Sequence, residues 1–189
     1  MNNFIEGENY NGNDFTQNRL VIAEYDNCTF NNCNFLDSDI SNITFIECEF
    51  NDCNMSNARI EHTAFQDVNF SNCKQLGLKF NECNDFLLSI NFTDCQLNFS
   101  SFYQLKLTQT TFDNCKLQEV DFTEANLSKS KFYKCDLKRS IFNTTNLEQV
   151  DFRSSINYTL DPDNNKLKKA KFSINEIHGL LTKYNIIIE

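Results

Sequence analysis

The chain has 189 residues, 40% of them hydrophobic, which is enough for one domain with a sizeable core. No apolar run approaches the ~20 residues that span a bilayer, so the composition argues against a membrane protein. Nine cysteines and an acidic N-terminus without an apolar signal segment indicate free thiols in a reducing cytoplasm.

The net charge of −9 is unevenly distributed along the chain. Residues 1–90 hold four basic and fourteen acidic residues, a net charge of −10, whereas residues 91–189 hold thirteen and twelve, a net charge of +1. The acidic half argues against direct contact with nucleic-acid phosphates and suits a basic partner surface. Keeping a repetitive chain soluble is an equally simple reason for the acidity.

Residues 1–9 form a lead-in, and a period of five residues begins at Tyr10. From Tyr10 to Ile90, fifteen of the seventeen positions in this series are apolar, the exceptions being Gln75 and Asp85. Two residues before each central position stands a small or aliphatic residue. A period of five matches neither a helix nor a long strand. We therefore expect each pentad to be a very short strand with two inward residues, followed by a corner.

A two-residue register slip over residues 91–96 separates this first segment, 10–90, from a second one over 97–172. The second segment alternates Leu and Phe from Leu97 to Phe152. Four pentads close a coil of twenty residues, so the pattern predicts an all-β, right-handed quadrilateral β-helix of about eight coils. Its rings are expected on two opposite sides: Phe102, Phe122 and Phe142 facing Phe112, Phe132 and Phe152.

Residues 173–189 differ from the repeats. Ser173 and Glu176 have the spacing of a helix-capping box, which predicts a short helix followed by a strand over Ile186–Ile188. Such a short helix must pack its apolar stripe on something, either the last coil as a cap or a second copy of the chain. The candidate cap or dimer contacts are Ile174, Ile177, Leu180, Leu181 and Tyr184.

The sequence offers little for catalysis or metal binding. All nine cysteines occupy the small slot two residues before a central position, and their spacing is not that of metal ligands. The two histidines, His62 and His178, have no nucleophile at a telling offset, and no glycine-rich phosphate loop occurs. We predict a protein that is not an enzyme and has no catalytic residue, cofactor site or metal site.

The repeat resembles the pentapeptide-repeat family, whose motif is a small residue, Asp or Asn, Leu or Phe, a polar residue and a variable one. Two pentads show the motif directly: Ala125-Asn126-Leu127-Ser128-Lys129 and Val120-Asp121-Phe122-Thr123-Glu124. The Leu160-Asp161-Pro162 turn, the short helix and the hydrophobic end resemble the Qnr-type fluoroquinolone-resistance subgroup, as does the stretch from Gly77 to Cys83.

The subgroup resemblance implies a bacterial, cytoplasmic homodimer joined through its C-terminal module. It implies binding to DNA gyrase or topoisomerase IV as an acidic mimic of duplex DNA, without direct nucleic-acid binding and away from membranes. Many members of that subgroup carry long projecting loops, for which this chain has room only at the two-residue slip. A general interaction scaffold with another protein partner is the alternative. The candidate acidic surface consists of Asp26, Asp37, Asp39, Glu47, Glu49 and Asp52.

Overall fold

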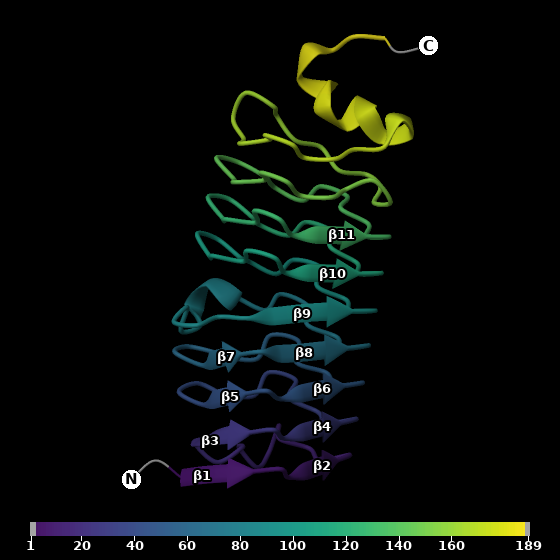
Figure 1. Cartoon of the computed structure of the whole chain (residues 1–189). Coiled ribbons are helices and arrows are strands. Elements are labelled where there is room, and N and C mark those ends of the chain that lie inside the picture. The colour runs from purple at the N-terminus through teal and green to yellow at the C-terminus, as the bar shows by residue number, and fades with distance from the viewer. Residues whose placement is uncertain (1–2, 188–189) are drawn as a thin grey trace.

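The computed structural model describes residues 3–187 as one parallel β-helix, whose turns stack from the N-terminus to the C-terminus (Figure 1). The predicted all-β, right-handed quadrilateral β-helix is confirmed. The strands form a four-stranded sheet, β1-β3-β5-β7, and a seven-stranded sheet, β11-β10-β9-β8-β6-β4-β2. Their bounds are β1 Asn3–Glu6, β2 Asn9–Asn11, β3 Ala23–Asp26, β4 Thr29–Asn31, β5 Thr44–Ile46, β6 Glu49–Asn51, β7 Ala64–Gln66, β8 Val68–Ser71, β9 Ile90–Thr93, β10 Thr111–Asp113 and β11 Lys131–Tyr133.

The β-helix has four walls, numbered here in the order in which each turn visits them. Wall 1 contains β1, β3, β5 and β7. Above them it continues as a bridge column, a series of single β-bridges between successive turns, through Lys106, Asn126, Asn146 and Lys166. Wall 2 contains the seven-stranded sheet. Wall 3 is the bridge column from Asp14 through Asn34 and Asn54 to Ile156, and wall 4 is the column that contains Asp39, Arg59, Lys79 and Ile141.

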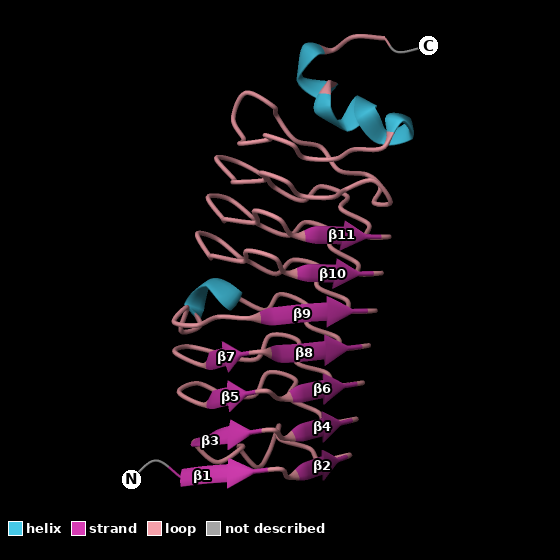
Figure 2. Cartoon of the chain, in the orientation of Figure 1, coloured by secondary structure: helices cyan, strands magenta, loops and turns pink. Residues whose placement is uncertain are grey.

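The ends of the β-helix differ from the prediction. Residues 3–9 are not a separate lead-in, because Asn3–Glu6 already pairs with Ala23–Asp26 one turn above. Seven turns carry a strand on wall 2, and single β-bridges continue the β-helix above them. The upper turns, drawn as loops in Figure 2, pair through single bridges such as Lys131 to Asp151 and Asp151 to Lys171.

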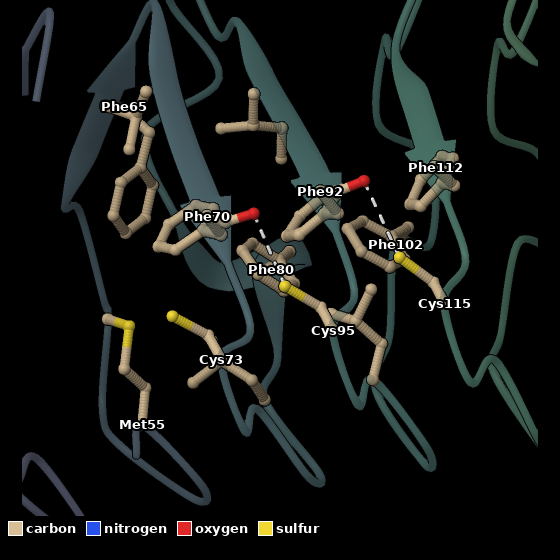
Figure 3. Packing of buried hydrophobic residues seen from close by; sticks show 14 of the residues in the cluster. Met55, Phe65, Phe70, Cys73, Phe80, Phe92, Cys95, Phe102, Phe112 and Cys115 are labelled. Atoms are coloured by element: carbon tan, nitrogen blue, oxygen red, sulfur yellow. Dashed lines mark hydrogen bonds between the residues drawn. The ribbon is translucent and has the colours of Figure 1, made fainter. Parts of the chain in front are cut away.

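Aromatic rings fill the interior in columns. On wall 2 nine rings stack from Tyr10 to Phe172 with centroids 4.7–5.5 Å apart. On wall 4, Phe102 and Phe122 stack at 5.3 Å, and Phe102 meets Phe112 of wall 2 edge-on at 5.9 Å. Figure 3 shows part of both columns, with Phe70, Phe92 and Phe112 of wall 2 facing Phe80 and Phe102 of wall 4. The two predicted ring columns are thus confirmed, in geometries that aromatic quadrupoles favour.

The small slot two residues before each central position also donates hydrogen bonds. The thiols of Cys95 and Cys115 donate to the carbonyl oxygens of Phe70 and Phe92 in the turn below, at 3.4 and 3.6 Å (Figure 3). The hydroxyl of Ser130 makes the equivalent bond to Leu107 at 2.7 Å. Cys, Ser and Thr are interchangeable in this slot because each is small and carries a donor.

The corners turn through residues in the left-handed region, which explains how a chain with only four glycines turns so often. A residue with positive φ follows two positions after most central residues, and the corner residues Asn32, Asp52 and Asn72 are examples. Asn and Asp tolerate this conformation best among residues with a side chain. Two corners place large apolar residues there instead, Leu87 with φ 57° and Phe99 with φ 65°.

The register slip lies earlier than predicted. Ala64 pairs with Asn84, twenty residues on, but Val68 pairs with Ile90, twenty-two residues on. The two extra residues therefore stand between Asn84 and Ile90 on wall 1, and the predicted slip over 91–96 is wrong. Just before them, on wall 4, the 3₁₀ helix η1 spans Phe80–Glu82.

The C-terminal module consists of two 3₁₀ helices, η2 Ile174–Leu180 and η3 Thr182–Tyr184. The predicted terminal strand is not formed by Ile186 and Ile187, and Ile188 lies outside the described residues. Within residues 3–187, no helix is long and apolar enough to cross a membrane.

Candidate protein-binding surfaces

The six predicted acidic residues do not share one surface. Asp26, Glu47 and Glu49 flank the corner between walls 1 and 2, and Asp52 follows at the far end of wall 2. Asp37 lies ten residues before Glu47, and Asp39 lies ten residues before Glu49. Ten residues are half a turn of the β-helix. Asp37 and Asp39 therefore flank the diagonally opposite corner, and a flat partner cannot contact both corners together.

Asp39 is also compensated by two cations. Its Oδ2 lies 3.2 Å from Nη1 of Arg19 and 2.6 Å from Nη2 of Arg59. Partial burial pushes the pKa of Asp39 upward, but hydrogen bonds from Ser41 and the two guanidinium charges outweigh it and lower the pKa. Asp39 therefore stays ionised while its charge is largely neutralised, and it contributes little to an acidic surface.

A continuous acidic surface does exist on wall 1 and its corner with wall 2. We call it the acidic wing. No ion pair found within residues 3–187 involves any of its members. It consists of Glu6, Glu24, Asp26, Glu47, Glu49 and Asp67.

Sequence reasoning selected three of these six residues and missed Glu6, Glu24 and Asp67. The missing signal was the position of each acidic residue within its pentad, since residues twenty apart share a wall. Asp67 also accepts a hydrogen bond from the Ser89 hydroxyl at 2.7 Å, which ties it to the bulge on the next turn.

The C-terminal module is partly docked and partly exposed. Leu180 packs against the core, and the carbonyl of Gly179 accepts a hydrogen bond from the Leu160 amide at 3.1 Å. Ile177 and Leu181 are half-buried, whereas Ile174 is 85% exposed and Tyr184 is 53% exposed. The predicted stripe thus divides into one part that faces the last turn and one part that faces outward.

The predicted capping box forms only in part. The Ser173 hydroxyl accepts a hydrogen bond from the Asn175 amide at 3.1 Å, as an N-cap does. The Glu176 carboxylate does not return to the helix start; it accepts from the backbone amide of Asn157 at 3.1 Å. Glu176 therefore holds the module to the last turns of the β-helix.

The described residues offer little catalytic geometry. His62 is an exposed corner residue with φ 59°, and His178 is exposed on η2. Within residues 3–187, no group of three or more His, Cys, Asp or Glu is arranged to hold a metal ion. Burial raises the pKa of the Cys48 and Cys83 thiols to about 12, which keeps them protonated and unreactive at neutral pH.

Comparison with known proteins identifies the same repeats. A family model described as a pentapeptide repeat region matches residues 23–85 and 79–152. A trypsin-treated variant of QnrB1, a plasmid-mediated fluoroquinolone resistance protein, has a TM-score of 0.64 at 18% identity, covering 98% of this chain and 100% of that one. Full-length QnrB1 has a TM-score of 0.58 at 19% identity, covering 97% and 100%. At this identity the likeness is one of fold, and no curated protein matches the sequence.

Proposed function

The chain belongs to the pentapeptide repeat family, and from that premise we propose that it is a non-enzymatic bacterial protein that binds a type II topoisomerase. DNA gyrase or topoisomerase IV is the proposed partner, and the acidic wing takes the place of duplex DNA. Binding in that place would keep drug-bound DNA off the enzyme, so protection from fluoroquinolones is the proposed consequence.

The observation that carries this proposal is the spacing of charge along the acidic wing. Its carboxylates recur in successive turns, which parallel strand pairing separates by ~4.8 Å. Each strand of duplex DNA presents a phosphate every ~3.4 Å, so both surfaces offer a rigid, regularly spaced row of negative charge. A protein cleft lined with basic residues for DNA would attract such a row at long range.

We also propose that the protein is a homodimer joined through its C-terminal module. The exposed Ile174 and Tyr184 are apolar groups that contact with a second copy would cover. The nine thiols are free, which is the state that a reducing cytoplasm maintains, and we place the protein there.

A supercoiling assay with purified gyrase and ciprofloxacin tests the proposal. The protein is titrated at two salt concentrations, and rescue of supercoiling, or inhibition without the drug, is expected at the lower one. The variant Glu47→Lys with Glu49→Lys should lose the effect. The matched variant Asp121→Lys with Glu124→Lys, which changes as many charges on wall 4, should keep it.

Two outcomes would contradict the proposal. If the folded protein changes neither supercoiling nor its drug sensitivity, the topoisomerase is not its partner, and a scaffold for another protein becomes the better explanation. If binding occurs but does not weaken as salt rises, the contact is apolar rather than an electrostatic imitation of DNA.

A further inference from the structure

Wall 1 reverses its charge along the β-helix. Above the acidic wing, the same wall and the same corner with wall 2 carry a cluster of exposed lysines, which we call the basic wing. None of them takes part in an ion pair found within residues 3–187. The basic wing consists of Lys106, Lys129, Lys131, Lys166, Lys168, Lys169 and Lys171.

Two carboxylates lie among these lysines, and they do not cancel the cluster. Asp151 is already bound to Arg153, with Nη2 and Oδ2 2.8 Å apart. Glu148 is the remaining acidic neighbour on this part of wall 1. Seven lysines against one unpaired carboxylate leave a strongly positive surface.

Between the two wings an apolar bulge projects from wall 1. It contains the two inserted residues of the register slip, and its tip is Phe86 and Leu87, which are 68% and 63% exposed. Leu87 is held there by a left-handed backbone with φ 57°. Two large apolar side chains at the tip of an otherwise charged wall are unusual for a surface without a partner.

The order of these features along the wall is symmetric. Four turns of wall 1, centred on Ile5, Tyr25, Phe45 and Phe65, carry the acidic wing. The next turn carries the bulge. Of the four further turns, those centred on Leu107, Leu127 and Leu167 carry the basic wing, and the turn centred on Leu147 carries Glu148 and Asp151.

We infer that wall 1 is a docking surface for wall 1 of a second copy, running antiparallel. A two-fold axis through the bulge places each acidic wing against the partner's basic wing and brings the two Phe86–Leu87 tips together at the centre. A two-fold interface requires this kind of self-complementary surface. An apolar centre with a charged rim is the usual anatomy of such contacts.

The size of the wall agrees with a reversible dimer. Nine turns at ~4.8 Å and about five residues per side at ~3.3 Å give roughly 700 Å² per copy. That is close to the roughly 800 Å² per partner of standard specific interfaces. Because the wings supply most of the contact, the dimer should depend strongly on salt.

A second copy fits this wall better than a nucleic acid. A nucleic acid would be attracted by the basic wing but repelled by the acidic wing, so it could cover only about half of the wall. A second copy satisfies both wings and covers the bulge. This contact uses the same acidic wing as the proposed topoisomerase binding, so the two contacts would exclude each other. It uses a different surface from the C-terminal module.

Charge-swapped variants test the pairing by sedimentation analysis of the purified protein at about 20 mM and about 500 mM salt. One variant carries Glu24→Lys, Glu47→Lys and Glu49→Lys, and the other carries Lys166→Glu, Lys168→Glu and Lys171→Glu. In the Ile174→Asp background, which removes association through the C-terminal module, the protein should dimerise at low salt, with a dissociation constant at least tenfold weaker at high salt. In the same background each charge-swapped variant alone should lose this dimer, and an equal mixture of the two should recover it.

Recovery in the mixture cannot come from misfolding of either variant, so it supports the pairing directly. An Ile174→Asp protein that is monomeric at low salt would overturn the inference. So would an Ile174→Asp dimer that resists high salt and both charge swaps, since its contact would not be a pairing of the two wings. Salt-dependent binding of a duplex DNA probe to monomeric protein, lost with the lysine swaps, would also overturn it and assign the basic wing to nucleic acid.

A cross-link gives the geometry. Phe86→Cys places a reactive thiol beside the proposed axis, whereas eight of the nine native thiols are buried and Cys83 is half-buried. A short bismaleimide should join two Phe86→Cys chains at low salt and not at high salt. The matched variant Tyr103→Cys, on wall 4, should not be cross-linked. Equal cross-linking of both variants would indicate random collisions and contradict the antiparallel contact.

Discussion

The Ser100 hydroxyl donates a hydrogen bond to the backbone carbonyl of Gln75 at 2.8 Å, yet neither polar atom of the Gln75 side chain has a partner. Gln75 is fully buried and lies in the core column of wall 3, between Met55 below and Leu97 above. An amide thus occupies a position that its neighbours fill with apolar side chains. Leaving its donor and acceptor unpaired away from water costs free energy.

Replacing this amide should stabilise the protein. Gln75→Met keeps the length of the side chain and removes the unpaired groups, so the free energy of unfolding should rise by about 1–3 kcal/mol. Urea unfolding followed by circular dichroism measures the change. Gln17→Met, at an exposed position, is the control and should have almost no effect. A loss of stability in Gln75→Met would mean that the amide has a partner in solution, such as an ordered water.

For stability, the presence of a hydrogen-bond donor in the small slot should matter more than whether that donor is a hydroxyl or a thiol. Ser130→Ala removes the hydrogen bond to the Leu107 carbonyl and should lower the free energy of unfolding by about 1 kcal/mol. Ser130→Cys keeps a donor of suitable size and should cost less. Ser128→Ala, on the outer surface two residues away, serves as the control. Equal stabilities for the Ala and Cys variants would show that packing alone, and not the hydrogen bond, selects residues for this slot.

The period of five residues predicted most of the core, because a buried position recurs whatever its neighbours are. The same signal misplaced the register slip: Ile90 is buried two residues before the central Phe92, and an isoleucine suits either inward position equally well. Only the pairing of Val68 with Ile90 reveals the difference.

Contacts between distant segments lay beyond the sequence pattern. The Ser173 and Glu176 spacing predicted a capping box, but Glu176 binds the Asn157 amide on the β-helix instead. Likewise, the acidity around Asp39 gave no hint that Arg59, one turn above, compensates its charge. The sequence predicted only part of the acidic wing. Acidic residues that are close together in the sequence lie on different walls, and their linear order alone does not assign each one to a wall.

Replacing Phe99 at its corner should stabilise the protein. Phe99 has φ 65° and is 60% exposed, so its ring gains little from burial while its backbone is in a region that disfavours bulky residues. Phe99→Asn should raise the free energy of unfolding by about 0.5–1 kcal/mol, because Asn adopts this conformation more readily. Tyr103→Asn, an exposed aromatic position with ordinary φ, should show no gain. A destabilised Phe99→Asn would indicate that the ring covers apolar surface that matters.

Stability should depend on pH through the buried thiols. Burial raises the pKa of Cys33 to about 11 and of Cys48 and Cys83 to about 12, whereas thiols in the unfolded chain ionise near 9. The unfolded state therefore releases these protons first, so this contribution is fully present below pH 9 and is lost as the pH rises toward 12. Urea midpoints should be flat from about pH 6 to 8 and fall above about pH 9. Cys48→Ser should flatten the alkaline decline, and an unchanged decline in that variant would assign it to other groups.

The contact between Gly179 and Tyr158 should decide whether the C-terminal module stays docked. A Cβ at position 179 would clash with the Tyr158 carbonyl oxygen, and this backbone atom cannot turn aside as a flexible side chain would. Gly179→Ala should therefore separate η2 from the last turn and expose residues 160–187 to amide hydrogen exchange, while the lower turns stay protected. Gly7→Ala, where nothing lies within 4 Å of the added atom, is the control and should leave the exchange of this module unchanged. If the module also joins two copies, Gly179→Ala should remove the association that persists at high salt and spare the salt-dependent pairing through wall 1. Unchanged exchange in Gly179→Ala would show that the module shifts as a unit without leaving the β-helix.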